Sequence, residues 1–137
     1  YRTAIDFNRR NYEKYLLNIN EYPEFKKLLY DNAVVYNYAG SLYYAANAFL
    51  QKSDVGNDLT HQYLEKAERL MREAILENYL DCFNDYLNNT GLLCRILNLQ
   101  GRFAEAKRIL SPCLETTQRL FGPSHEVTKS LLALDAF

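Results

Sequence analysis

The sequence has few of the residues that interrupt helices. Three prolines and five glycines occur in 137 residues, and almost all of them lie where a helix would begin or end. Proline and glycine are the residues that mark turns, which all-β proteins need in large numbers. Their scarcity leaves little room for an all-β fold and favours an all-α one.

Neither sign of charge is in excess. Lysine and arginine total 16 against 17 aspartate and glutamate residues, which gives a net charge of -1. Proteins that bind nucleic acid usually carry a basic face to neutralise phosphates. We therefore expect no nucleic-acid partner.

Cysteine is also scarce. Cys82, Cys94 and Cys113 are odd in number and form no C-x-x-C pair, which fits a reducing compartment better than a secreted disulfide framework. No apolar run approaches the roughly 18 residues that a membrane span needs. We expect a cytoplasmic protein with no membrane partner.

The length and the 48% hydrophobic content suit one compact domain or a short array of helix pairs. The chain begins at Tyr1 rather than at Met and ends in an apolar stretch at Phe137. We therefore expect it to be a segment of a longer polypeptide.

The sequence contains no phosphate-binding, dinucleotide-binding, hydrolase or zinc-protease motif. His61 and His125 share no zinc-site spacing with each other or with a cysteine. Cys94 and Cys113 stand at positions where small side chains pack, so we expect inert core thiols. We predict no catalytic residue, no metal site and no cofactor, and therefore no enzyme.

Hydrophobic periodicity predicts a series of amphipathic helices. The expected helices run from the start to about Asn20, from Pro23 with Phe25, Leu28 and Leu29 as its apolar side, and over Ala33 to Leu50, Leu59 to Asn78, Tyr79 to Leu99, Phe103 to Phe121 and Ser124 to Phe137. Residues 51–58 have the composition of a loop, and Gly101 suits a helix C-terminus. Pro112 is expected to bend or split its helix.

Three helix starts carry candidate N-caps. Asp31 or Asn32 is able to cap a new helix, although the preceding helix could also continue through them. Asp58 or Thr60 is expected to cap the helix after the loop, and Ser124 the last helix.

Two of the predicted helix pairs share a pattern of small residues. Ala67 and Ala74 are seven residues apart, as are Ala106 and Cys113, which follow 39 residues later. On the preceding helices, Gly40 followed by Tyr43 matches Cys94 followed by Leu97. This pattern resembles the tetratricopeptide repeat, and the ending L-F-G-P-S-H-E-V is similar to the long repeats of kinesin light chains.

The resemblance is specific over residues 84–137, moderate over 33–78 and absent from 1–32. It implies antiparallel helix pairs stacked as a short right-handed superhelix, an α-solenoid. The repeats would be 33–78, 79–121 and the start of a third at 123–137, with 1–32 as N-terminal helices that pack on the array.

In the family that the chain resembles, the inner helices line a concave groove that holds a peptide main chain. Amide side chains suit this role because they donate and accept hydrogen bonds at once. The expected function is an adaptor or scaffold module that binds a peptide or protein segment. The groove-facing positions that the resemblance implies are Asn37, Tyr38, Ser41 and Tyr44 on the first helix, and Asn88, Leu92, Arg95 and Asn98 on the second.

A second function remains open: a regulatory or sensory, self-associating arm of a larger signalling ATPase or transcription regulator, or the helical domain of a SET-domain-type enzyme. Open ends of helical repeats expose apolar faces unless they are capped. The apolar residues near the end of the chain predict a homodimer through such an end; they are Leu131, Leu132, Leu134 and Phe137.

Overall fold

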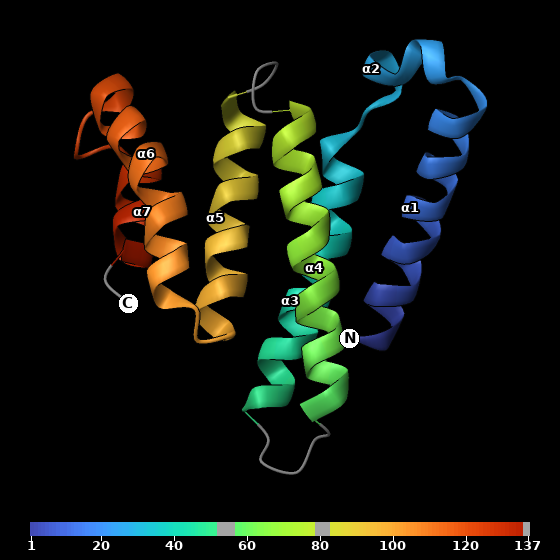
Figure 1. Cartoon of the computed structure of the whole chain (residues 1–137), viewed down its shortest axis with the longest axis horizontal. Coiled ribbons are helices and arrows are strands. Elements are labelled where there is room, and N and C mark those ends of the chain that lie inside the picture. Colours follow the sequence, from blue (N-terminus) through green and yellow to red (C-terminus); the bar gives the residue numbers. More distant parts are fainter. Residues whose placement is uncertain (52–56, 79–82, 136–137) are drawn as a thin grey trace. The chain divides into compact units, whose positions relative to one another are not determined.

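The computed structural model describes residues 1–51, 57–78 and 83–135, and these ranges contain helices, turns and no strand. The all-α prediction is therefore confirmed. Figure 1 shows the helices in chain order: α1 (Arg2–Glu21), a 3-10 turn (Pro23–Phe25), α2 (Lys26–Leu29), α3 (Asn32–Leu50), α4 (Asn57–Asn78), α5 (Phe83–Leu99), α6 (Phe103–Phe121) and α7 (Glu126–Asp135).

The chain forms two compact units, residues 1–74 and residues 75–137. We call them unit 1 and unit 2. The boundary falls within α4, so that unit 1 holds α1, α2, α3 and most of α4. Unit 2 holds the last turn of α4 together with α5, α6 and α7.

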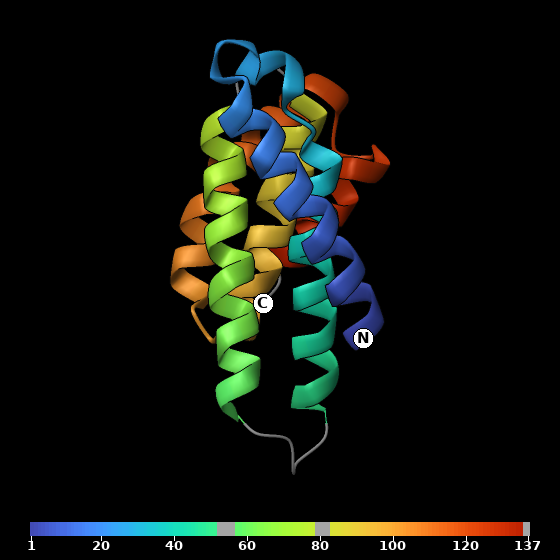
Figure 2. The same cartoon turned by 90° about the vertical axis from the view of Figure 1, so that its right-hand side faces the viewer.

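Aromatic rings join α1 to α3 in unit 1. The two helices run antiparallel (Figure 1), and α1 lies across α3 and α4 when the molecule is turned (Figure 2). The rings of Tyr12 and Tyr38 are 5.3 Å apart between centroids, and those of Tyr1 and Phe49 are 6.4 Å apart. Offset and edge-on ring pairs at such distances add to the free energy of burial, so some of the 12 tyrosines of the chain serve to hold these helices together.

The connection between α1 and α3 contains a true helix break. The Asp31 carboxylate accepts a hydrogen bond from the Ala33 backbone N–H at 3.0 Å, so Asp31 is the N-cap of α3 and the preceding helix does not continue. The apolar side expected for the segment from Pro23 is not buried, because Phe25 is 50% exposed and Leu28 is 83% exposed.

The next helix pair, α3 and α4, is joined by long side chains. Phe49 stacks on Tyr63 with 6.0 Å between ring centroids, and the Lys66 ammonium lies 5.5 Å from the centre of the Tyr38 ring. The apolar stripe that the sequence predicts for α4 is buried except at its end, where Ile75 is half-buried; the buried members are Leu64, Ala67, Leu70, Met71 and Ala74. Of the predicted loop, residues 52–56 lie outside the described residues.

The expected N-cap of α4 is wrong. This helix begins at Asn57, so Asp58 and Thr60 lie inside its first turn. Thr60 is also buried there, which makes it a packing residue rather than a cap.

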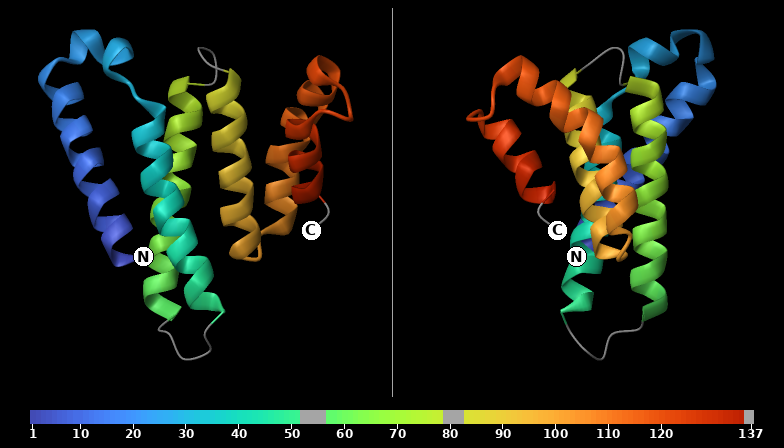
Figure 3. Two further views of the ribbon diagram at one scale, coloured as in Figure 1. Left: turned by 180° about the vertical axis from the view of Figure 1, so that it is seen from behind. Right: turned by 60° about the vertical axis from the view of Figure 1, so that its left-hand side comes forward.

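A glycine turn joins α5 to α6 in unit 2 (Figure 3). Gly101 has φ 77°, as predicted for a helix C-terminus. The Gly101 N–H donates to the Asn98 carbonyl at 3.0 Å and the Arg102 N–H to the Leu97 carbonyl at 2.9 Å, which is the hydrogen-bond pattern of a Schellman motif.

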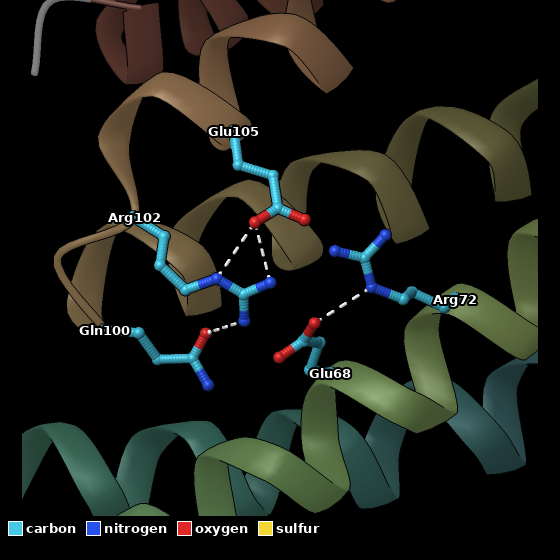
Figure 4. Close-up of polar contacts among 5 residues, drawn as sticks. All are labelled: Glu68, Arg72, Gln100, Arg102 and Glu105. Atoms are coloured by element: carbon cyan, nitrogen blue, oxygen red, sulfur yellow. Dashed lines mark hydrogen bonds and ion pairs between the residues drawn. The ribbon is translucent and has the colours of Figure 1, made fainter.

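Hydrogen bonds of the Arg102 side chain also stabilise the turn. Its guanidinium donates to the Glu105 carboxylate at 2.7 and 2.9 Å and to the Gln100 amide oxygen at 2.9 Å (Figure 4). These contacts tie the last residue of the turn to both helix ends. Figure 4 also shows the Glu68–Arg72 ion pair on α4, in which the two side chains are one helical turn apart and 2.9 Å separates the Arg72 Nε and Glu68 Oε2 atoms.

Small side chains set the contact between α5 and α6. The Cys94 thiol lies 3.6 Å from the Ala106 carbonyl oxygen, and Cys94, Ala106 and Cys113 are all buried. The predicted packing role of these three residues is confirmed.

The expectation that Pro112 splits its helix is wrong, because α6 runs from Phe103 to Phe121 through it. Proline lacks the N–H that would bond the carbonyl of Arg108. Both residues are exposed, so water can hydrogen-bond that carbonyl and the helix can continue.

The cap of α7 is His125 and not Ser124. The His125 carbonyl accepts the first hydrogen bond of the helix from Lys129 at 2.9 Å, and the Nδ1 atom accepts from the Val127 N–H at 3.2 Å. The imidazole also stacks on Phe121 with 4.8 Å between ring centroids. His125 therefore takes the capping position that was predicted for Ser124.

Replacing Ala106 with leucine tests the close approach of α5 and α6. A larger side chain forces the helices apart, so we expect Ala106→Leu to lower the free energy of unfolding by about 1 to 3 kcal/mol. Ala104→Leu is the matched control, because Ala104 is exposed on the same helix. Urea unfolding measures both, and equal stabilities of the two variants would contradict the packing role.

Candidate functional site

The predicted residues on α3 divide into exposed and buried ones. Asn37 is exposed and Tyr44 is 60% exposed. Ser41 is half-buried, and its hydroxyl donates to the Tyr38 carbonyl at 2.7 Å. Asn37 and Tyr44 are therefore the two exposed side chains among these four residues.

Tyr38 lies in the core of unit 1 and is removed from the candidate site. Its side chain is 2% exposed, with Tyr12 and Lys66 against its ring. It occupies the side of α3 that α1 and α4 cover, so a ligand cannot reach the ring without displacing them.

The predicted residues on α5 divide in the same way. Asn88 is exposed, and Arg95 and Asn98 are half-buried. Leu92 is 3% exposed, so its side chain belongs to the packed interior and is also removed from the candidate site.

The structure adds two glycines that sequence reasoning did not assign to the site. Gly40 of α3 and Gly91 of α5 are buried in their helices, yet a Cβ atom built on either would meet no heavy atom within 4 Å. Glycine in a helix interior costs about 1 kcal/mol relative to alanine. No packing contact in the structure requires that cost.

The two glycines stand at equivalent places. Asn37, Gly40, Tyr44 and Asn47 have the same spacing as Asn88, Gly91, Arg95 and Asn98. In each set the first asparagine is exposed, the glycine is buried and the last asparagine is half-buried. We call these sets the α3 strip and the α5 strip.

This spacing changes the match made from the sequence. Gly40 was matched with Cys94 as a packing point, but Cys94 contacts Ala106 whereas a Cβ atom on Gly40 would touch nothing. The equivalent of Gly40 in exposure and position is Gly91. Searching the sequence for the asparagine–glycine–asparagine spacing would have found it.

Each strip follows one face of its helix. Residues separated by three, four and seven positions share a helix face, and the members of each strip are separated by three, four and three. Two amides on each strip can donate and accept hydrogen bonds. Each strip therefore offers amide donors and acceptors at or near the surface, with a buried glycine between them.

The cysteines of unit 2 are unsuited to nucleophilic chemistry. Burial raises the pKa of the Cys94 thiol to about 12, and the neighbouring Cys113 adds to the rise. Burial also raises the pKa of Cys113, while hydrogen bonds with Thr117 and Tyr86 act in the opposite direction. A thiol must ionise to attack or to bind metal, so both are core thiols; Cys82 lies outside the described residues.

Among the described residues no group of three or more histidine, cysteine, aspartate or glutamate side chains is arranged to hold a metal ion. The imidazole of His61 faces Glu65 at 3.0 Å on the exposed start of α4. None of the helices in the described ranges has an apolar stretch long enough to cross a membrane.

The chain matches no protein-family model, no curated protein and no solved structure. The candidate site therefore rests on the residues and their geometry alone.

The open space around Gly91 predicts that alanine is tolerated there. We expect Gly91→Ala to raise the free energy of unfolding by up to about 1 kcal/mol, because alanine favours the helix and meets no neighbour. Gly101→Ala is the matched control and should destabilise, because Gly101 has φ 77°. Urea unfolding of both variants checks this, and a loss of stability in Gly91→Ala would show that glycine is needed for packing.

The raised pKa of Cys94 predicts a loss of stability at high pH. The unfolded chain releases this proton near the ordinary value of 9.0, whereas the folded protein keeps it up to about 12. Ionisation thus favours the unfolded state as pH rises between these values, by about 1.4 kcal/mol at pH 10.

Urea unfolding at about pH 8 and about pH 10, with reducing agent present, measures the effect. Cys94→Ala should lose less stability between these pH values than the parent does. Equal losses in the two proteins would contradict the burial of this thiol as the cause.

Proposed function

We propose that the chain is a protein-recognition module that binds extended peptide segments, and that the α3 strip and the α5 strip each provide a recognition surface. The observation that supports this best is the recurrence of the strip. Two helices carry asparagines at the same spacing around a glycine that no packing contact explains.

The chemistry of the strips suits a peptide main chain. An extended peptide presents N–H and C=O groups that must be hydrogen-bonded when they leave water. Asn37 and Asn47 on α3, and Asn88 and Asn98 on α5, can serve as both donors and acceptors.

Arg95 distinguishes the α5 strip from the α3 strip. Its guanidinium is half-buried and stands where α3 has Tyr44. Arginine provides several donors in one plane, so this position favours peptide carbonyl or carboxylate groups. As part of this proposal, the helix pairs stack in a tetratricopeptide-like superhelix, and the role is that of an adaptor or scaffold.

Selection from a random peptide display library on the purified chain tests the function. We expect selected peptides to bind Asn88→Ala and Arg95→Glu at least about tenfold more weakly, which is about 1.4 kcal/mol. Both variants should keep the Tm of the parent, because Asn88 is exposed and Arg95 is half-buried.

Asn11→Ala is the matched control, because Asn11 is an exposed helical asparagine on α1, away from either strip. It should bind the selected peptides as the parent does. Selected peptides that bind all three variants equally would overturn the assignment of the site to the α5 strip, and loss of Tm together with binding would show a structural role instead.

A further inference from the structure

A row of exposed apolar side chains lies on the segment that connects α1 to α3. Tyr22, Phe25 and Leu28 are 47%, 50% and 83% exposed, and each is three residues from the next. The Phe25 N–H donates to the Tyr22 carbonyl at 3.0 Å, which is the hydrogen bond of a 3-10 turn. Because side chains at this spacing share one side of a 3-10 or an α-helix, the three residues form one row, which we call the connector stripe.

The packing of unit 1 does not use the connector stripe. The Tyr30 ring, at the end of the connection, packs edge-on against Tyr15 of α1 with 5.8 Å between ring centroids, and Leu29 is half-buried. The connection is therefore fixed to α1 by other side chains. Figure 1 shows it at the end of α1, where the chain turns back towards α3. Large apolar side chains that are grouped and exposed in this way are typical of surfaces that bind a protein or a membrane.

A second row of exposed side chains runs beside the stripe and carries both signs of charge. Glu21, Glu24 and Lys27 are also three residues apart, and all three are exposed. Within the part of the chain that the structure describes, none of the three forms an ion pair. Glu24 and Lys27 are thus neighbouring groups of opposite charge that are available to a partner.

These charges favour one kind of partner. Two glutamates and one lysine leave the row with an excess of negative charge, so it offers no attraction to the anionic headgroups of a membrane. A protein surface that fits the row must present an acidic group beside a basic one, with apolar side chains next to them. A second copy of this segment presents this arrangement.

The order of the residues makes the segment complementary to itself. A two-fold axis reverses the direction of the second copy, so a residue before the axis in one copy faces a residue after it in the other. An axis near Phe25 brings Glu24 of each copy to Lys27 of the other, so the same ion pair forms twice. The same axis places Tyr22 against Leu28 and the two Phe25 rings against each other.

We propose that the chain forms a two-fold symmetric dimer in which the connector stripes of two copies pack together and Glu24 of each copy pairs with Lys27 of the other. Three apolar side chains from each copy make a small interface, so the dimer is weak and forms at high protein concentration. It involves neither the α3 strip nor the α5 strip, and its test is independent of peptide binding.

Sedimentation equilibrium of the whole chain between about 10 µM and about 1 mM tests the association. We expect the average mass to rise with concentration towards that of two copies. Leu28→Ser should weaken the dimer at least about tenfold, because an apolar contact is lost. Leu76→Ser is the matched control, since Leu76 is 80% exposed and lies outside the stripe. A chain that stays monomeric throughout, or equal weakening by the two variants, would overturn the proposal.

Reversing the charges tests the pairing itself. Glu24→Lys gives a chain that presents two lysines at the contact, and Lys27→Glu gives one that presents two glutamates. Each variant alone should self-associate at least about tenfold more weakly than the parent, because like charges then face each other. An equimolar mixture of the two should regain the association of the parent, since every facing pair is again of opposite sign.

Glu13→Lys and Lys14→Glu are the matched control pair for the charge reversals. Both residues are exposed on α1, outside the connection, and these variants should associate as the parent does, alone or mixed. A mixture of Glu24→Lys and Lys27→Glu that stays monomeric would rule out the pairing. The same pattern of loss and recovery in the control pair would show that net charge governs the association, and it would overturn the proposal as well.

Discussion

The close contact between the Cys94 thiol and the Ala106 carbonyl is the constraint on which unit 2 depends. At 3.6 Å the thiol lies against the backbone of α6, and the Ala106 side chain is only 3% exposed, so both positions favour small residues. Because α5 and α6 approach so closely, the apolar residues beside the contact are fully buried, Leu93, Ile96, Leu97 and Leu110 among them. The Schellman turn at Gly101 directs α6 back along α5 and so makes this contact available. The α5 strip, which comprises Asn88, Gly91, Arg95 and Asn98, takes no part in this contact.

Unit 1 reaches the same kind of pairing by different means. Rings rather than small side chains join α1 to α3, and Tyr12 is buried deeply enough between helices that its pKa is raised, with the nearby Glu73 carboxylate adding to the effect. Packing of this kind explains several of the 12 tyrosines. It does not explain Tyr44, whose side chain is 60% exposed.

Local backbone chemistry explains which parts of the fold were predictable. A glycine with positive φ at Gly101 and a carboxylate cap at Asp31 act over a few residues, so the sequence alone contains the information. The choice between Ser124 and His125 as a cap depended on how the imidazole stacks on Phe121 across the turn, a side-chain arrangement that the residue types alone do not show. The exposure of Phe25 and Leu28 likewise could not be read from an apolar pattern, because a pattern does not say whether another element covers it.

The exposure of the candidate residues could be predicted only in part, because it also depends on which elements pack against each helix. Asn37, Tyr44, Asn88, Arg95 and Asn98 lie at or near the surface as the repeat pattern suggested, whereas Tyr38 and Leu92 differ from them by a rotation about the helix axis that only packing determines. Gly40 was assigned to packing and Gly91 was not considered, because a small residue in a helical repeat ordinarily marks a packing point.

Gly40 and Gly91 are the residues whose presence the folded chain explains least. Each costs about 1 kcal/mol in its helix, which is appreciable against the 5 to 15 kcal/mol that typically separates folded from unfolded protein. Packing does not account for them, since a Cβ atom would meet nothing, and neither helix ends at its glycine, since α3 and α5 continue to Leu50 and Leu99. What the two glycines share is their setting, because each lies between asparagines that are exposed or half-buried and that can hydrogen-bond a peptide main chain.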